Sequence, residues 1–412
     1  MPLGWAGPSP LEYRMVKGSA FEDPLISKAV IYLQPSLGRP AAVRGKPSGT
    51  SGEIRYFLGY AGKRQVVVAM DSASPVNLYM ARDGGMDLTE AKLLPRTKVA
   101  GKAATIGVDY QYGPAVLASE KAPKAAATKA VAADELAVDE ARTPVLIASL
   151  HDAALAMYPA GYMAGEVKAG GHPYKVALID RNFDGAYLVA GAGDQYRTSD
   201  EGDLLAIDLN GDGQFEQSSE ASFPEIRSLE RMLTIEEAFY EMKVARNGST
   251  IELVAAKSET GTLAVNRPGV ELMISGDVGK QFLAGNKTKW EIPAGHYMCQ
   301  MIRLTAKDAD GNMWVLQAFG DTGKLQSFDI KAGEELALEL GPPLNLDVDV
   351  QQQSAGWIVR GKEMAVGFQI VGQAGERYSP GAMKNGQQVP APKIKIYDEK
   401  GEVLASGDFQ YG

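Results

Sequence analysis

Short apolar segments that recur between turn signals are the feature that most constrains the fold of this chain. Residues 65–71 (QVVVAMD), 175–180 (KVALID), 203–209 (DLLAIDL) and 335–340 (ELALEL) are examples. Segments of this length, rich in aliphatic residues and bounded by Gly and Asp, are typical of β-strands in sandwiches and barrels. Gly makes up 46 of the 412 residues, which provides many positions for tight turns. The sequence therefore predicts an all-β protein.

Two dipeptides predict tight β-hairpins. Asn247-Gly248 separates two alternating segments within residues 242–256, and Asp310-Gly311 does the same within residues 292–320. Asn, Asp and Gly tolerate the positive φ that such turns require. Helical patterns are sparse. Residues 146–158 are predicted to form about three helical turns that end before Pro159.

An alanine-rich segment interrupts the β-like pattern. Residues 118–141 contain ten alanines in 24 positions, which gives high helix propensity without an apolar stripe. We expect a linker or an exposed helix over residues 118–142. A membrane-surface helix is the alternative, but its lysines and acids are mixed along the segment instead of lying on separate faces.

An internal similarity flanks this segment. Residues 59–88 and 167–215 each contain an apolar strand, a Gly turn, a strand that ends in Asp (Asp71 and Asp180) and a further strand. We therefore expect a duplicated β-unit over residues 10–260. The loop of the first copy, residues 82–87, lacks regularly spaced acids and is predicted to hold no ion.

Two local resemblances concern the remaining chain. The run Pro293-Ala-Gly295-His-Tyr297 resembles a strand of prealbumin-like and carboxypeptidase-regulatory-like sandwiches, in which the Tyr points into the core. Residues 390–412 resemble the closing hairpin of Ig-like bacterial modules. These resemblances imply a prealbumin-like sandwich at 261–343 and an Ig-like sandwich at 344–412.

The clearest functional motif is DxNxDG, which occurs twice. In such a loop the side chains at positions 1, 3 and 5 converge on a hard cation. The predicted side-chain ligands are Asp180, Asn182 and Asp184 in the first loop, and Asp208, Asn210 and Asp212 in the second.

The motif resembles the first half of EF-hand and dockerin calcium loops. The resemblance implies that Gln214 gives its carbonyl and that Glu216 acts directly or through water. Position 12 departs from the pattern, since it is Gly191 in the first loop and Ser219 in the second where those loops have a bidentate Glu.

The charge distribution favours a cation at these loops. Residues 178–220 contain ten acidic residues and two arginines, whereas the whole chain has a net charge of −9. Carboxylates this close repel one another unless a divalent cation offsets the repulsion. Bare turns, in which Asx side chains cap the backbone, are the alternative interpretation. We expect calcium.

Composition excludes several classes of function. The 51 acids outnumber the 42 bases, which argues against a nucleic-acid partner, and no apolar run reaches the length of a transmembrane segment. Three histidines and one cysteine leave little for catalysis. His296 and Cys299, three residues apart on a strand, are expected on opposite faces, with Cys299 in the core. We do not expect an enzyme.

The leading hypothesis is a non-enzymatic, extracytoplasmic structural or adhesive protein that calcium stabilises, with self-assembly or a cell-surface partner. The chain is similar to uncharacterised exported bacterial proteins that carry DxNxDG loops and a C-terminal sandwich. Its start, Met-Pro-Leu-Gly-Trp, shows no signal peptide, so we expect export to have removed one.

The alternative is a carbohydrate-binding or glycan-processing protein, whose polysaccharide would contact the loop carboxylates and exposed tryptophans. The tryptophans are Trp5, Trp290, Trp314 and Trp357.

Overall fold

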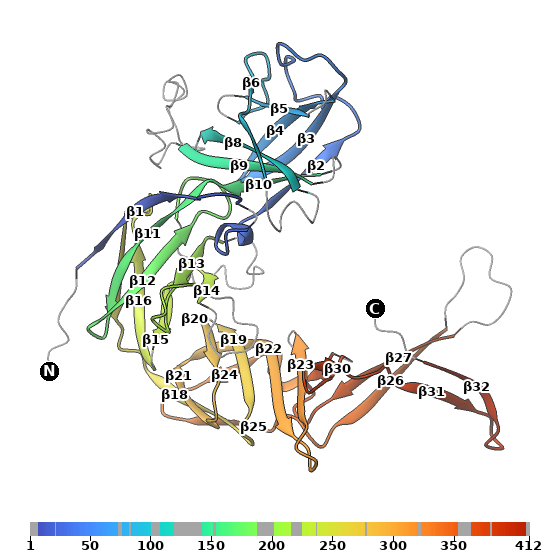
Figure 1. Cartoon of the computed structure of the whole chain (residues 1–412). Helices are drawn as coiled ribbons and strands as arrows, with labels where there is room; N and C mark the ends of the chain where they lie inside the picture. The colour runs from blue at the N-terminus through green and yellow to red at the C-terminus, as the bar shows by residue number, and fades with distance from the viewer. Residues whose placement is uncertain are drawn as a thin grey trace. The chain divides into compact units, whose positions relative to one another are not determined.

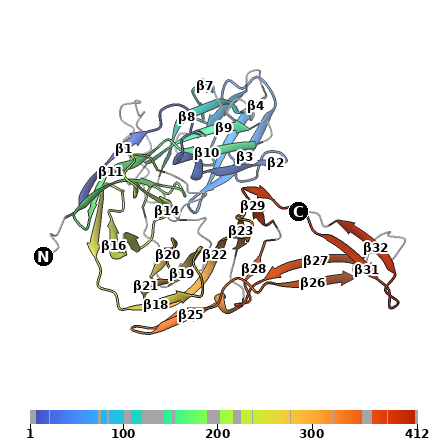
Figure 2. The ribbon, with the colours of Figure 1, turned by 60° about the horizontal axis from the view of Figure 1, so that its bottom comes forward.

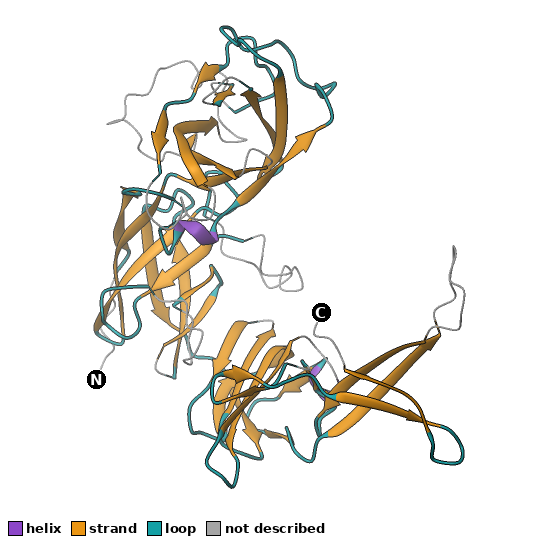
Figure 3. Cartoon of the chain, turned by 45° about the vertical axis from the view of Figure 1, so that its right-hand side comes forward, coloured by secondary structure: helices purple, strands orange, loops and turns teal. Residues whose placement is uncertain are grey.

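The computed structural model describes residues 7–20, 22–72, 76–81, 84–99, 108–118, 142–150, 154–187, 202–215, 225–235, 237–276, 278–319, 323–352, 364–379 and 381–408. Within these ranges the regular elements are β-strands and two short 3-10 helices, η1 (Ile26–Lys28) and η4 (Gly323–Leu325), as Figure 3 shows. None of the described helices is long and apolar enough to cross a membrane. The all-β class is confirmed. The chain divides into a first unit, residues 1–219 with 224–256, and a second unit, residues 220–223 with 257–412.

The first unit contains a nine-stranded sheet with the order β6-β5-β4-β3-β2-β10-β9-β8-β7 (Figures 1 and 2). Its strands are β2 (Ile31–Ser36), β3 (Ile54–Ala61), β4 (Arg64–Asp71), β5 (Asn77–Met80), β6 (Lys92–Leu93), β7 (Arg96–Lys98), β8 (Val108–Ala118), β9 (Arg142–Leu150) and β10 (Ala154–Pro159). The two end strands follow each other in the chain. The sheet curls around one core to which β2 to β5 and β8 to β10 all contribute.

An eight-stranded sheet with the order β14-β13-β12-β11-β1-β17-β16-β15 completes the first unit. Its strands are β1 (Ser9–Met15), β11 (Gly161–Ala169), β12 (His172–Ile179), β13 (Leu204–Ile207), β14 (Ile226–Ser228), β15 (Met232–Ile235), β16 (Ala238–Val244) and β17 (Thr250–Ala255). This sheet also curls around its own core, and its end strands β14 and β15 are again consecutive in the chain.

A further core joins the two curled sheets, and it explains why some strands lack polar residues. On β12, Val176 and Leu178 lie in the core of the eight-stranded sheet, whereas Ala177 and Ile179 lie in the core shared with β9 and β10. Both faces of β12 are therefore buried, and a strand buried on both faces has a continuous apolar sequence.

The prediction of a helix over residues 146–158 is wrong, and burial of both strand faces again explains the error. Residues 146–150 belong to β9 and residues 154–158 belong to β10, and the two strands pair antiparallel with Ala154 opposite Leu150. On β10, Leu155 and Met157 lie in the core of the nine-stranded sheet, while Ala156 and Tyr158 lie in the shared core. Two buried faces remove the polar alternation that would have identified the strands.

The second unit has two sheets whose buried side chains belong to one core. The smaller has the order β21-β18-β25, and the larger has the order β20-β19-β22-β23-β29-β30 with β24 paired to β22. Their strands are β18 (Thr260–Val265), β19 (Val270–Gly276), β20 (Gly279–Leu283), β21 (Lys289–Pro293), β22 (Gly295–Lys307), β23 (Met313–Phe319), β24 (Phe328–Ile330), β25 (Glu335–Leu338), β29 (Met383–Lys384) and β30 (Gln387–Gln388).

Tyr297 is fully buried in this core, as the prealbumin-like pattern implies, and its hydroxyl donates to the carbonyl of Pro293 at 2.9 Å. Tyr378 is buried in the same core, so residues on both sides of position 344 share it.

Two small sheets follow. One has the order β26-β27-β28 and the other pairs β31 with β32. Their strands are β26 (Asn345–Gln352), β27 (Met364–Val371), β28 (Arg377–Tyr378), β31 (Lys393–Tyr397) and β32 (Val403–Asp408). The closing hairpin is thus present, while the Ig-like sandwich stays a prediction.

Several local predictions can be placed in this fold. Asn247-Gly248 and Asp310-Gly311 lie in the β16–β17 and β22–β23 hairpin turns, where Gly248 and Gly311 have φ of 73° and 81°. The segments behind the proposed duplication form two antiparallel meanders, β3–β4–β5 and β11–β12–β13. The duplication itself stays a prediction. The alanine-rich residues 119–141 lie outside the described residues.

Candidate functional site

The two DxNxDG loops follow neighbouring strands. Residues 180–185 come directly after β12, and residues 208–213 come directly after β13. Because β12 and β13 are antiparallel, with Ile179 opposite Leu204 and Val176 opposite Ile207, the loops lie at opposite ends of the strand pair. At about 3.3 Å per residue they are roughly 16 Å apart. Each loop is therefore a separate candidate site.

The second loop is wound by its own side chains. Asp208 Oδ2 accepts a hydrogen bond from Gly213 N at 2.9 Å, Asn210 Oδ1 accepts from Asp212 N at 2.8 Å, and Asp212 Oδ1 accepts from Gln214 N at 2.8 Å. These contacts bend the backbone so that positions 1, 3 and 5 lie on the inside of the turn. A carboxylate or amide oxygen that accepts one hydrogen bond keeps a further lone pair with which it can coordinate a cation.

The first loop repeats this pattern position by position. Asp180 Oδ2 accepts from Gly185 N, Asn182 Oδ1 accepts from Asp184 N and Asp184 Oδ1 accepts from Ala186 N, each at 2.9 Å.

The backbone also matches. Position 4 has φ of 62° at Phe183 and 75° at Gly211, and position 6 has φ of 76° at Gly185 and 86° at Gly213. Two independent segments thus adopt one loop conformation.

Two Asx turns in the second unit are built differently. In the β22–β23 turn, Asp308 Oδ1 accepts from Asp310 N and Asn312 N, which are two and four residues later. Asp398 does the same with Lys400 N and Glu402 N in the β31–β32 turn. The DxNxDG conformation is therefore not the general turn chemistry of this protein.

A buried carboxylate from the next strand supports each loop. Asp203, just before β13, accepts from Arg181 N of the first loop at 3.3 Å. Glu225, just before β14, accepts from Leu209 N and Asn210 N of the second loop at 2.8 and 3.2 Å. Sequence analysis missed both roles, because each acid is separated by at least 15 residues from the N–H groups that it contacts.

The first residue of each loop is buried. Asp180 and Asp208 are both 4% exposed. Burial, with a smaller contribution from the Asp184 carboxylate, raises the pKa of Asp180 to about 7. A divalent cation at this position would favour the ionised carboxylate and offset that effect.

The first loop also joins the two curled sheets of the first unit. Phe183, at position 4, is 2% exposed and packs in the core of the nine-stranded sheet. The carbonyl of Asn182 accepts from Gly62 N, in the β3–β4 turn of that sheet, at 2.5 Å. Tyr187 returns to the core of the eight-stranded sheet, where its N–H donates to Arg246 O at 2.7 Å. Phe183 has a positive φ, and its burial in the core of the nine-stranded sheet holds it in that conformation.

The remaining predicted site residues have mixed outcomes. Gln214 N donates to Asp212 Oδ1, and the role of its carbonyl as a ligand stays a prediction, whereas Glu216 and both position-12 residues lie outside the described residues. In the first copy, Asp87 accepts from the N–H and hydroxyl of Thr89, a local turn contact. Among the described residues, no three His, Cys, Asp or Glu side chains gather as a metal-binding group. Each loop instead contributes two aspartates and one asparagine.

The described tryptophans are engaged with the protein. Trp314 Nε1 donates to Asp308 Oδ2 at 2.9 Å and Lys384 Nζ lies 5.2 Å from the ring centroid, while Trp290 packs against the core of the second unit. Both rings remain partly exposed, and Trp5 and Trp357 lie outside the described residues, so the sugar-binding alternative stays a prediction.

One polar series was not anticipated. His296 Nδ1 lies 2.8 Å from Asp329 Oδ1, and its Nε2 lies 3.2 Å from Ser327 Oγ. The order of groups is that of a nucleophile, a base and an orienting acid. However, His296 and Asp329 are cross-strand neighbours on β22 and β24, with side chains 38% and 67% exposed. We interpret the series as cross-strand pairing on an open sheet face. Cys299 is fully buried, as expected.

Comparisons of this chain with protein-family models, curated proteins and solved structures gave no match.

Proposed function

We propose that this chain is a non-enzymatic, extracytoplasmic structural or adhesive protein whose first unit is stabilised by calcium at two DxNxDG loops. The ligands in this proposal are the side chains of Asp180, Asn182 and Asp184 in one loop, and of Asp208, Asn210 and Asp212 with the Gln214 carbonyl and Glu216 in the other.

The observation that carries the proposal is the shared conformation of the two loops. Both form the same three hydrogen bonds from the side chains at positions 1, 3 and 5, and both have positive φ at positions 4 and 6. Oxygen ligands at these positions suit Ca²⁺, which accepts irregular, oxygen-rich coordination.

The expected affinity supports the proposed location. Without a bidentate acid at position 12, Kd should lie near 10⁻⁴ to 10⁻³ M, the range of extracellular calcium modules. A site this weak would be empty in the cytosol and occupied outside the cell.

Thermal unfolding of the full chain in calcium and in chelator tests the proposal. Calcium at tenfold excess over Kd should stabilise the first unit by about 1.4 kcal/mol for each occupied loop, or about 2.8 kcal/mol for both, which corresponds to several degrees in Tm. The variants Asp212→Ala and Asp208→Asn should lose the part of this shift that comes from the second loop, and Asp184→Ala the part from the first.

Asp87→Ala is the matched control, because the Asp87 carboxylate accepts hydrogen bonds from Thr89 in a turn of the degenerate copy and its loss should leave the calcium-induced change in Tm unchanged. If melts of the native chain in calcium and in chelator coincide, the loops are turns and the proposed location loses its support.

A further inference from the structure

Two strands in the C-terminal part of the second unit present unpaired outer edges and exposed apolar side chains. Among the described residues, β26 is hydrogen-bonded only to β27, and β31 only to β32. Leu346 and Val348 on β26 are 68% and 55% exposed, and Tyr397 on β31 is 54% exposed. A two-stranded ribbon without a buried face is marginally stable in water. These edges are therefore suited to further pairing.

The two edges have complementary sequences. In β26 (NLDVDVQQ) aspartates alternate with aliphatic residues, and in β31 (KIKIY) lysines alternate with isoleucines. In an antiparallel register that places Asp347 opposite Lys395, Leu346 falls opposite Ile396 and Val348 opposite Ile394. Each lysine of β31 then meets an aspartate and each isoleucine meets Leu346 or Val348, while Tyr397 falls opposite Asn345.

The same pattern disfavours the other pairings. Two β26 edges in antiparallel register would bring aspartates together, and two β31 edges would bring lysines together, which is destabilising for directly opposite residues. Lysines on an edge strand normally prevent association. Here another edge of the chain carries the matching acids. Asp347 lies 3.8 Å from Arg377 of β28, but both side chains are more than half exposed, so this contact is weak.

We propose that the outer edge of β26 in one copy of this chain pairs with the outer edge of β31 in a second copy. The inference deepens the proposed structural role and rests on it. Because each copy carries both edges, the contact is heterologous and extends head to tail into a ring or an open filament. A contact of about five residue pairs is small, so each junction should be weak and the assembly concentration-dependent.

Charge exchange between the two edges tests this proposal. Sedimentation velocity of the full chain in chelator, over a wide concentration range, should show reversible association. Asp347→Lys with Asp349→Lys should weaken self-association by about tenfold or more, and so should Lys393→Asp with Lys395→Asp, because each variant places like charges opposite one another.

Mixing the two variants should restore association, since each then offers the edge that the other needs. All four substitutions in a single chain should restore it as well. Far-UV circular dichroism confirms that each variant keeps its β-structure.

A native chain that stays monomeric at every concentration would overturn the proposal. Variants with the charges of one edge exchanged that associate like the native chain would also overturn it, and so would a mixture of the two variants that does not associate. Because chelator is present throughout, failure of the calcium proposal would leave this result unchanged, and a chain that binds calcium could still fail here.

Discussion

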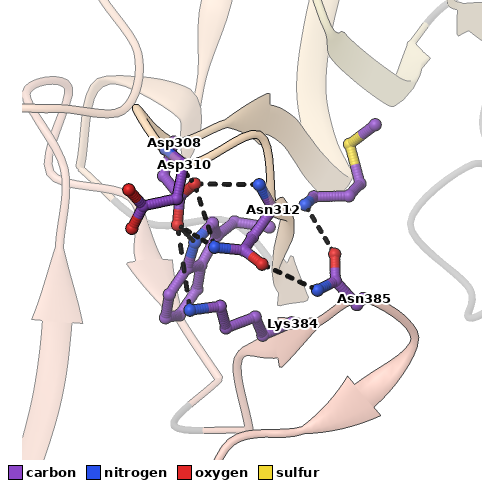
Figure 4. Close-up of polar contacts among 7 residues, drawn as sticks. Asp308, Asp310, Asn312, Lys384 and Asn385 are labelled. Atoms are coloured by element: carbon purple, nitrogen blue, oxygen red, sulfur yellow. Dashed lines mark hydrogen bonds and ion pairs between the residues drawn. The ribbon is translucent and has the colours of Figure 1, made fainter.

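Asp308 shows how much a single carboxylate can organise in this protein. Its oxygens accept hydrogen bonds from the Trp314 indole at 2.9 Å and from the Asn312 side chain at 3.0 and 3.1 Å (Figure 4). Lys384 Nζ lies 3.8 Å away, and Asn385 links Asn312 to the β29–β30 hairpin. The hydrogen bond from Trp314, followed by those from Asn312, holds the pKa of Asp308 well below its usual range.

This lowered pKa predicts a pH-dependent contribution to stability. The contribution is complete above the unfolded-state pKa of about 3.9 and is lost as the pH falls towards the folded-state pKa. The difference in Tm between the native chain and Asp308→Asn should therefore be largest at neutral pH and should narrow below about pH 4. Thermal melts across this pH range measure it.

Asp310→Asn is the control, because Asp310 joins the network through its backbone N–H. A Tm difference for Asp308→Asn that stays constant from neutral to acid pH would contradict the assigned role.

At the scale of elements, hairpin turns depend on both backbone conformation and packing. Gly171 in the β11–β12 turn and Gly248 in the β16–β17 turn both have positive φ, 89° and 73°. A Cβ at Gly171 would meet nothing within 4 Å, whereas one at Gly248 would lie 2.5 Å from the Tyr187 ring and 2.8 Å from Met163 Cγ.

The two glycines therefore form a matched pair within one sheet. Gly171→Ala should destabilise the first unit by about 1–2 kcal/mol, the usual effect of a left-handed backbone on a residue with a side chain. Gly248→Ala should lower the free energy of unfolding by roughly 1–3 kcal/mol more than Gly171→Ala does, because its methyl group would overpack against Tyr187. Denaturant unfolding measures the free energy of unfolding of both variants. Equal decreases would contradict the packing argument, because they would show that the Tyr187 ring moves aside without cost.

At the scale of the whole molecule, the buried cores fall into two groups. Among the described residues, four clusters lie within the first unit and one lies within the second. Both DxNxDG loops belong to the first unit. The second unit has its own buried carboxylate, Glu376, which accepts from Gly341 N at 2.6 Å, from Ala374 N at 2.9 Å and from the Tyr378 hydroxyl at 2.8 Å.

We therefore expect two transitions in calorimetry, of which calcium raises only the one from the first unit. The variant Glu376→Gln identifies the transition of the second unit. Its amide cannot accept hydrogen bonds at both former carboxylate positions, so the substitution should destabilise the second unit by about 1–3 kcal/mol. Exposed Glu334→Gln is the control. A calcium shift in the transition that Glu376→Gln lowers would place the ion outside the two loops.

Local sequence was enough to determine the fold class, the hairpins and the form of the loops. Turns at Asn247-Gly248 and Asp310-Gly311 depend on residues next to one another, and so do the Asx contacts of both DxNxDG loops. Such contacts span a few residues and are encoded where they form.

Only the tertiary structure determined the features that depend on contacts between residues far apart in the sequence. It determined that β9 and β10 are strands buried on both faces, that Phe183 enters the core of the neighbouring sheet, and that Asp203 and Glu225 support the loops. It also kept the two loops apart, since antiparallel strands carry them to opposite ends. Burial and strand pairing arise from the whole chain, so no local pattern contains them.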